Sequence, residues 1–224
     1  MQLEAYLHRD DRIVLPIGST EQHAYLSLGT DAILAERVAV EAAEPLGVPV
    51  LPVLPFGITP TFAAFPGSPS LRTETLLGVV RDLLDSLHDQ GFRRILLLNG
   101  HGGNAPVRSL AREWTVAHPD GQALYHEWFG PRTYAVIRAV EPDGQHASWW
   151  ENFPWTRLEG VDVPQEPKPL MDMSAYEVAD ARGARKLLGD GSFGGPYERP
   201  QDDLDRVWNA AVAEARDALE NGWR

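Results

Sequence analysis

Carboxylate and imidazole side chains with the spacing of metal ligands are the part of this sequence that could do chemistry. Glu21 and His23 lie two positions apart, Asp31 follows eight positions after His23, and His101 lies in an Asn-Gly-His turn. On an extended segment, Glu21 and His23 would point to one side and could each bind a different ion. Mixed oxygen and imidazole ligands suit zinc, manganese or iron. The pattern therefore predicts a hydrolase that uses two divalent metal ions.

Composition limits the class of protein and the kind of site. The 224 residues, 43% of them hydrophobic, can bury a complete core and are expected to form one domain. The chain has no cysteine, so any metal site must use histidine, aspartate and glutamate. The net charge of -12, with no basic patch, argues against a nucleic-acid partner. No tract reaches the roughly 18 apolar residues that cross a bilayer, so we expect no membrane partner and a cytoplasmic location.

Short apolar runs alternate with amphipathic segments, which is typical of a mainly parallel sheet covered by helices, an α/β fold. Strands are expected at 13–17, 94–98 and 123–128, with a weaker, proline-interrupted strand at 48–54. Helices are expected at 31–43, 73–90, 105–118 and 203–221. The stretch between Trp128 and Pro169 is rich in proline, glycine and aromatic residues and is expected to form ordered loops.

The candidate ligands are expected at one edge of this sheet. In parallel sheets, ligands bind outside the carboxyl ends of the strands, which is where Glu21, His23 and His101 would emerge. Asn104 has the position and residue type of an N-cap for the helix that starts at Ala105. The pattern of strands and the chemistry of these side chains therefore indicate the same place.

Four separated motifs occur in an order that resembles the creatininase (creatinine amidohydrolase) family. They are G-S-T-E-Q-H at 18–23, T-D at 30–31, N-G-H at 99–101 and H-A-x-x-x-E at 146–151. The resemblance implies a metal-dependent hydrolase with a three-layer α/β/α fold, a small-molecule substrate and a homo-oligomeric, commonly hexameric assembly. It also implies that Glu21 and His101 hold one ion, that His23 holds the other, and that Asp31 bridges them.

The chain departs from the family pattern at two points. Members that cleave creatinine have a further carboxylate two residues after the histidine of N-G-H, where this chain has Gly103. The resemblance therefore makes Glu151 the candidate for the missing ligand and His146 the acid/base residue. The link between His23 and Asp31 is also one residue shorter than usual. Both departures argue against creatinine itself as the substrate.

The substrate-binding candidates lie beside these ligands. Trp149 and Trp150 flank Glu151 and could stack on a small ring, although large aromatic residues in loops equally often fill a subunit contact. Gly102 and Gly103 could let the backbone approach the metal or substrate, or could only permit a turn. We expect the close approach and a pocket that includes both tryptophans.

The expected reaction follows from what paired divalent ions do. They lower the pKa of a shared water and polarise a carbonyl, while a neutral His146 could accept a proton and return it to the leaving group. The segments 21–31 and 146–155 most resemble the branch that hydrolyses a diketo-inositol, 3-dehydro-scyllo-inosose, at a carbon-carbon bond to give an open-chain uronate. Hydrolysis of a cyclic amide or formamide remains an alternative. A non-catalytic ligand-binding protein, motivated by Gly103, remains another.

Overall fold

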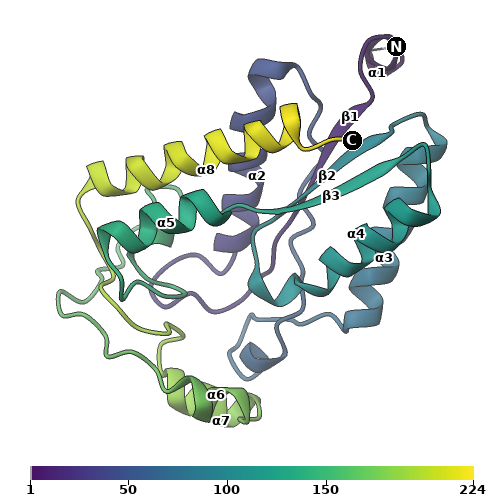
Figure 1. The fold of residues 1–224 in the computed structure, drawn as a ribbon. Coiled ribbons are helices and arrows are strands. Elements are labelled where there is room, and N and C mark those ends of the chain that lie inside the picture. The colour runs from purple at the N-terminus through teal and green to yellow at the C-terminus, as the bar shows by residue number, and fades with distance from the viewer. Residues whose placement is uncertain (1) are drawn as a thin grey trace.

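The computed structural model describes residues 2–224, and its centre is a parallel three-stranded sheet (Figure 1). The strands are β1 (Arg12–Ile17), β2 (Arg94–Asn99) and β3 (Gln122–Glu127), in the order β1-β2-β3. Their registers place the last residues of all three strands side by side. The strands expected at 13–17, 94–98 and 123–128 and the parallel sheet are therefore confirmed.

The prediction of a strand at 48–54 was wrong. This segment runs beside β1 but makes only two isolated parallel bridges to it, through Val50 and Leu54. Three prolines lie in or directly after the segment, and a proline has no N–H to donate to a strand ladder. The segment is therefore an irregular edge of the sheet.

Helices cover both faces of the sheet because alternate strand residues point to opposite faces. On one face, Val14 and Leu96 pack with α2 (Thr30–Ala43) and α8 (Gln201–Asn221) in a single buried cluster. On the other face, Leu15 belongs to a second cluster with α3 (Thr73–Asp89) and α4 (Pro106–Ala117). This arrangement confirms the three-layer α/β/α prediction, and each of these four helices begins and ends within about two residues of its predicted bounds.

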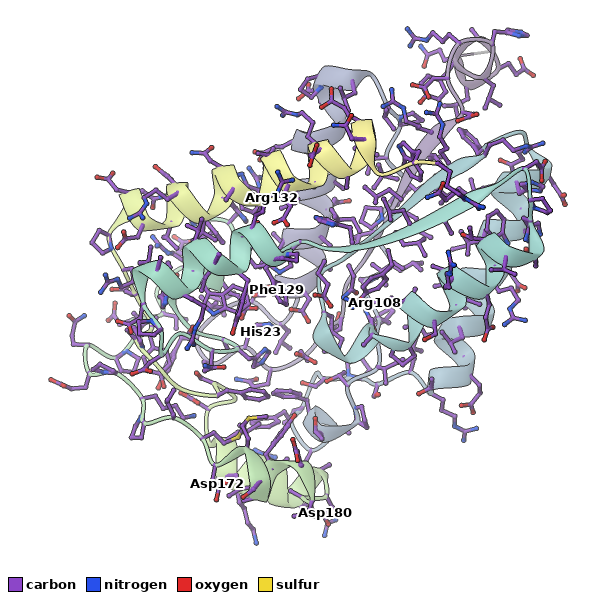
Figure 2. The ribbon with its side chains drawn as sticks, in the orientation of Figure 1. His23, Arg108, Phe129, Arg132, Asp172 and Asp180 are labelled. Atoms are coloured by element: carbon purple, nitrogen blue, oxygen red, sulfur yellow. The ribbon has the colours of Figure 1, made fainter. Side chains whose placement is uncertain are left out.

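Loops were predicted throughout the stretch between Trp128 and Pro169, but part of this stretch is helical. It contains α5 (Pro131–Val140), which packs against α8, and Figure 2 shows Arg132 at the start of α5, facing α8. The carboxylate of Glu214 on α8 accepts hydrogen bonds from the N–H groups of Arg132 and Thr133 at 3.0 and 2.8 Å. These bonds satisfy the first turn of α5 from a distant part of the chain, a cap that local sequence does not reveal.

Several shorter elements were not predicted. They are α1 (Gln2–Leu7), α6 (Met173–Glu177), α7 (Ala181–Leu188), and the 3-10 helices η1 (Glu44–Leu46), η2 (Pro60–Phe62), η3 (Gly102–Asn104) and η4 (Trp149–Glu151). Figure 1 shows α6 and α7 together below the main body, and α7 packs against η2. No helix between residues 2 and 224 has both the length and the apolar character to cross a membrane.

Candidate metal centre

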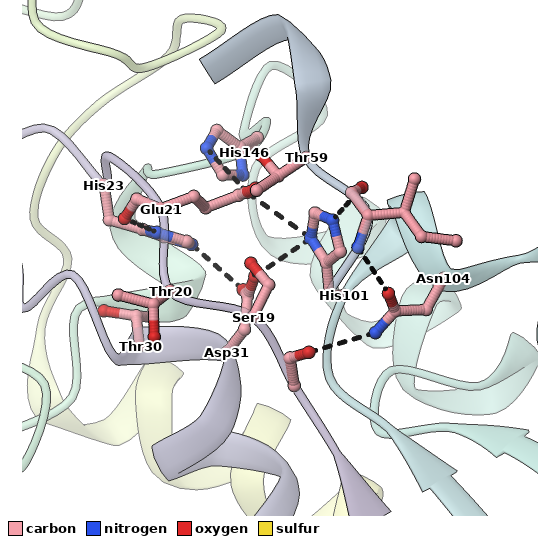
Figure 3. Close-up of polar contacts among 12 residues, drawn as sticks. Ser19, Thr20, Glu21, His23, Thr30, Asp31, Thr59, His101, Asn104 and His146 are labelled. Carbon is pink, nitrogen blue, oxygen red and sulfur yellow. Dashed lines mark hydrogen bonds and ion pairs between the residues drawn. The ribbon is translucent and has the colours of Figure 1, made fainter. Parts of the chain in front are cut away.

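Five buried carboxylate and imidazole side chains meet at the carboxyl ends of the strands. Glu21 and His23 follow β1, and Asp31 lies in the first turn of α2. His101 directly follows the turn after β2, and Glu151 ends η4. Each of the five is at most 8% exposed. The structure therefore brings together all five ligand candidates that were proposed from the sequence, four of which are shown in Figure 3.

The carboxylate of Asp31 lies between two sets of ligand atoms. Its Oδ1 is 3.0 Å from His23 Nε2, and its Oδ2 is 2.9 Å from His101 Nδ1. One set is Glu21, Asp31 and His101, and the other is His23, Asp31 and Glu151. Within each set the ligand atoms lie within 4.8 Å of one another, the spacing of groups that can share a cation. Asp31 is common to both sets.

Backbone carbonyls orient the two histidines of these sets. His101 Nε2 is 2.9 Å from the carbonyl oxygen of Ile58, and His23 Nδ1 is 3.1 Å from that of Glu21. A carbonyl oxygen only accepts, so both of these ring nitrogens must be the donors. In the neutral rings, His101 Nδ1 and His23 Nε2 therefore carry the lone pairs, and these are the atoms that face Asp31.

The polar atoms of the cluster fit divalent cations. Glu21 Oε2 is buried and has no hydrogen-bond partner, and His23 Nε2 faces only carboxylate oxygens, of which Asp31 Oδ1 is the nearest. Within the part of the chain that the structure describes, histidines are the only cationic side chains within 4 Å of the three carboxylates. Buried carboxylates without compensation are costly, and oxygen and imidazole donors suit zinc, manganese or iron.

The carboxylates strongly perturb the two histidines. Burial alone lowers the pKa of His23, but the adjacent Asp31 outweighs burial and raises this pKa to about 10. Burial likewise lowers the pKa of His101, but the charge of Glu21 and the hydrogen bonds of His101 with Asp31 and Glu21 raise this pKa well above the usual value. Burial raises the pKa of Glu151 to about 7. Protons thus balance part of the negative charge, and a bound cation would replace them.

His146 lies at the edge of the cluster and differs in its electrostatics. Its ring centroid is 4.4 Å from that of His23, and its Nε2 lies 3.7 Å from Glu21 Oε1. Nε2 donates to the carbonyl oxygen of Gln22 at 3.3 Å. Burial and the nearby His23 lower the pKa of His146 to about 4, so it is neutral at pH 7. A neutral imidazole here can accept a proton.

Backbone strain is concentrated beside two of these histidines. Among the described residues, the non-glycine positions with positive φ are Ala24 at 50° and Ala147 at 54°. They directly follow His23 and His146, and the N–H of Ala147 donates to Glu151 Oε2 at 2.6 Å. Left-handed backbone at a non-glycine residue is uncommon and collects at functional sites. No feature of the sequence signalled this strain.

A cavity of about 550 Å³ opens onto the cluster. Its lining includes the proposed substrate-binding residues Gly102, Gly103 and Trp150, together with Glu21, Asp31, His101, His146 and Glu151. Trp149 does not line it, because its indole is fully buried in the core with α2 and α8. Of the two tryptophans proposed for the pocket, the structure therefore places only Trp150 there.

Sequence reasoning missed most of the cavity wall. Six aromatic side chains between positions 62 and 193 line it: Phe62, Phe129, Tyr134, Trp150, Tyr176 and Phe193. The rings of Phe62 and Phe193 stack with centroids 6.2 Å apart, and those of Phe129 and Trp150 meet edge to face at 5.2 Å. Phe129 could have been found, because it follows the end of β3. Trp150 was proposed from the sequence, whereas the other four depend on long-range packing.

The prediction that Asn104 caps α4 was also wrong. The helix begins at Pro106, and no side chain caps it. The side chain of Asn104 bonds instead to the backbone N–H of Ile58, to the carbonyl of Gly18 and to Asn99. The residue therefore joins loops beside the cluster rather than starting the helix.

Comparison with known proteins shows similar sequences that are hydrolases. The 3-dehydro-scyllo-inosose hydrolase of Thermotoga maritima is 31% identical across 98% of this chain and 76% of that protein. The creatinine amidohydrolase of Pseudomonas putida is 35% identical over 99 residues, 42% of this chain and 38% of that protein. A mycofactocin precursor peptide peptidase of Mycolicibacterium smegmatis is 34% identical over 49% of this chain and 46% of that protein. The matched regions thus span less than half the length of the last two relatives.

Solved structures show the same fold at lower identity. Creatinine amidohydrolase (creatininase) has a TM-score of 0.79 and 24% identity, with 99% of this chain and 94% of that chain covered. A zinc–zinc form of a creatininase mutant has a TM-score of 0.78 and 23% identity, covering 99% and 96%. A manganese form has a TM-score of 0.75 and 22% identity, with the same coverage. At these identities the likeness establishes the fold alone.

A match to a whole family also covers nearly all of this chain. The creatininase family, described as creatinine amidohydrolase, matches residues 1–219, which contain the cluster, the cavity and all three strands. The fold of the solved relatives agrees with that match. This chain belongs to the creatininase family.

Proposed function

We propose that this protein is a hydrolase that works with two divalent metal ions. Glu21 and His101 would hold one ion, His23 and Glu151 the other, and Asp31 would bridge them. The observation that carries the proposal is the Asp31 carboxylate, whose two oxygens face two different histidines at 3.0 and 2.9 Å. The zinc–zinc and manganese forms of similarly folded creatininases support divalent ions of these kinds.

The residues around the ions would each contribute to hydrolysis. Bound ions would supply Lewis acidity, lowering the pKa of water and polarising a substrate carbonyl. His146, neutral at pH 7, would accept the proton of the attacking water and pass it to the leaving group. Trp150 would form a face of the substrate pocket, and Gly102 and Gly103 would leave room beside His101. These roles make the cavity an active site.

The substrate we favour is a cyclic 1,3-diketone, 3-dehydro-scyllo-inosose. Water would add to one carbonyl carbon, the bond from that carbon to the carbon between the two ketones would break, and its electron pair would leave as an enolate that is then protonated. The product of this cleavage would be an open-chain keto acid that retains the second ketone, which makes it the uronate of a ketose. The similarity to the Thermotoga maritima hydrolase over 98% of this chain supports this choice.

A cyclic amide or formamide is the second candidate, because the same geometry can attack an amide carbonyl. The 99-residue match to creatinine amidohydrolase favours it. We also propose that the protein works in the cytoplasm as a homo-oligomer, a hexamer by family resemblance.

Metal stoichiometry and substrate turnover test the proposal. We expect close to two ions per chain by elemental analysis of the purified protein, and one fewer in Glu151→Ala. We also expect faster turnover of the diketo-inositol than of creatinine or formamides. A protein that retains no ion after supplementation would contradict the metal-dependent hydrolase. Two ions with no turnover of any of these substrates would instead support a ligand-binding protein.

A further inference from the structure

The side chain of Asn104 joins three segments at the metal cluster, and Figure 3 shows two of its hydrogen bonds. Its Oδ1 accepts from the N–H of Ile58 at 3.0 Å. Its Nδ2 donates to the carbonyl of Gly18 and to Asn99 Oδ1, each at 3.1 Å. The residue is fully buried, and both hydrogens of its amide are used. Asn104 therefore holds the loop after residue 57 against the ends of β1 and β2.

The residue that Asn104 holds is the one that orients His101. While the N–H of Ile58 donates to Asn104, its carbonyl oxygen accepts from His101 Nε2 at 2.9 Å. This bond places the proton of the neutral ring on Nε2 and directs Nδ1 toward Asp31 and Glu21. A chain of contacts thus runs from Asn104 through Ile58 to the lone pair of His101.

Two glycines allow these groups to meet. A Cβ at position 103 would lie 2.0 Å from the carbonyl oxygen of Ile58 and 2.4 Å from His101 Nε2. A Cβ at position 57 would lie 2.6 Å from Asn104 Oδ1. None of these three distances occurs between a Cβ and an unbonded atom in a relaxed structure. The space that a side chain at position 103 would need is therefore occupied by the carbonyl that orients His101.

We propose that Asn104 is a positioning residue that sets, through the carbonyl of Ile58, which nitrogen of His101 binds the metal. The inference rests on the proposed two-ion site and concerns only the ion held by Glu21, Asp31 and His101. His23, in the other set, is oriented by the carbonyl of Glu21 and makes no contact in this chain of bonds. Loss of Asn104 should therefore affect the two ions unequally.

Metal titration of Asn104→Ala tests this asymmetry. We expect one of two zinc-binding steps, measured in competition with a chromogenic chelator, to weaken by about 10- to 100-fold, the usual effect of losing support for a ligand. The other step should change by less than about threefold. The matched control is Thr115→Val, which removes two buried hydrogen bonds near the far end of α4, away from the cluster. Equal weakening of both steps, or none, would overturn the proposal.

A second measurement needs no variant. In zinc-loaded wild-type protein labelled with ¹⁵N-histidine, long-range ¹H–¹⁵N spectra should show His101 bonded to zinc through Nδ1, with its proton on Nε2. Coordination through Nε2 would refute the proposal even if Asn104→Ala failed to fold. The conservative variant Asn104→Asp keeps an acceptor for the Ile58 N–H, so it should retain the Nδ1 coordination. A wild-type protein that binds fewer than two ions would contradict the proposed function. The coordinating atom of His101, compared between wild type and the Asn104 variants, tests only the positioning by Ile58 and Asn104.

Discussion

Removal of the Glu214 carboxylate should destabilise the protein and loosen one wall of the cavity. Its Oε1 accepts from the N–H of Arg132, and its Oε2 accepts from the N–H and hydroxyl of Thr133 at 2.8 and 2.7 Å. Glu214 is 5% exposed. These bonds hold the start of α5, the helix that carries the cavity residue Tyr134.

The magnitude follows from the number and burial of these bonds. A hydrogen bond to a charged group is worth about 1.5–3 kcal/mol, and a donor left buried without a partner adds a penalty of similar size. Arg132 is exposed, so its N–H can regain water in Glu214→Ala, whereas Thr133 is fully buried. We therefore expect a loss of about 3–5 kcal/mol, which lowers Tm by on the order of 10 °C in a domain of this size.

Thermal and urea unfolding of matched variants provide the assay. Glu220→Ala makes the same substitution at an exposed position on the same helix and should change stability by less than about 0.5 kcal/mol. If Glu214→Ala unfolds with the same midpoint as Glu220→Ala, the carboxylate does not cap α5 and our reasoning is refuted.

The pH dependence of the unfolding free energy gives an independent check that the ionised carboxylate of Glu214 stabilises the folded state. Burial raises the pKa of Glu214, but the N–H of Arg132 and the groups of Thr133 outweigh burial, and the net pKa is below the ordinary 4.5. The ionised carboxylate therefore stabilises the folded state above about pH 4.5, and this stabilisation is lost as the pH falls through the folded pKa. The difference in unfolding free energy between wild type and Glu214→Ala should shrink in acid.

Three further predictions concern the cluster directly. His146→Ala should keep its metal content but lose turnover by roughly 100-fold or more, and unchanged turnover in steady-state assays would assign the proton transfer to another group. Gly102→Ala should bind zinc normally because nothing lies within 4 Å of the added carbon, whereas Gly103→Ala should lose at least about tenfold in affinity at one site by chelator competition. Zinc added to metal-free protein at pH 8 in weak buffer should release protons, because the pKa of His23 is raised to about 10. Calorimetry in buffers of different ionisation enthalpy counts the released protons. A count of zero would show that zinc does not displace a proton from His23.

The sheet and its main helices could be predicted because their signals are local. The apolar run before Asn99 and the leucine spacing of α3 each occur within one element. The start of α5 could not be predicted, since the group that satisfies it lies on α8, more than 80 positions later. The segment 48–54 beside β1 was predicted as a strand because most of its residues are apolar, although its prolines lack the N–H groups that a strand ladder needs.

The ligand candidates could be proposed because they lie in motifs of the resemblance and at strand ends. What motifs could not show is which neighbours orient them. The role of the Ile58 carbonyl depends on a loop that approaches His101 from a different part of the chain. Asn104 looked like a helix cap because its residue type suits that role, yet the folded chain uses its amide to join loops. Trp149 and Trp150 are adjacent in sequence, but only Trp150 faces the cavity.

The chemistry of the cavity wall has a consequence for how a catalytic cycle would finish. Among the described residues that form the wall, none is lysine or arginine, and six are aromatic. A neutral ring can rest its C–H faces on such surfaces, but opening that ring by hydrolysis creates an acid that ionises. The wall offers that new anion no counter-charge, so the ions proposed for the floor, whose charge three carboxylates already offset in part, would be its only cationic partners. Product would therefore be held at its metal-facing end alone, and exchange of that end for water would free the anion into solvent.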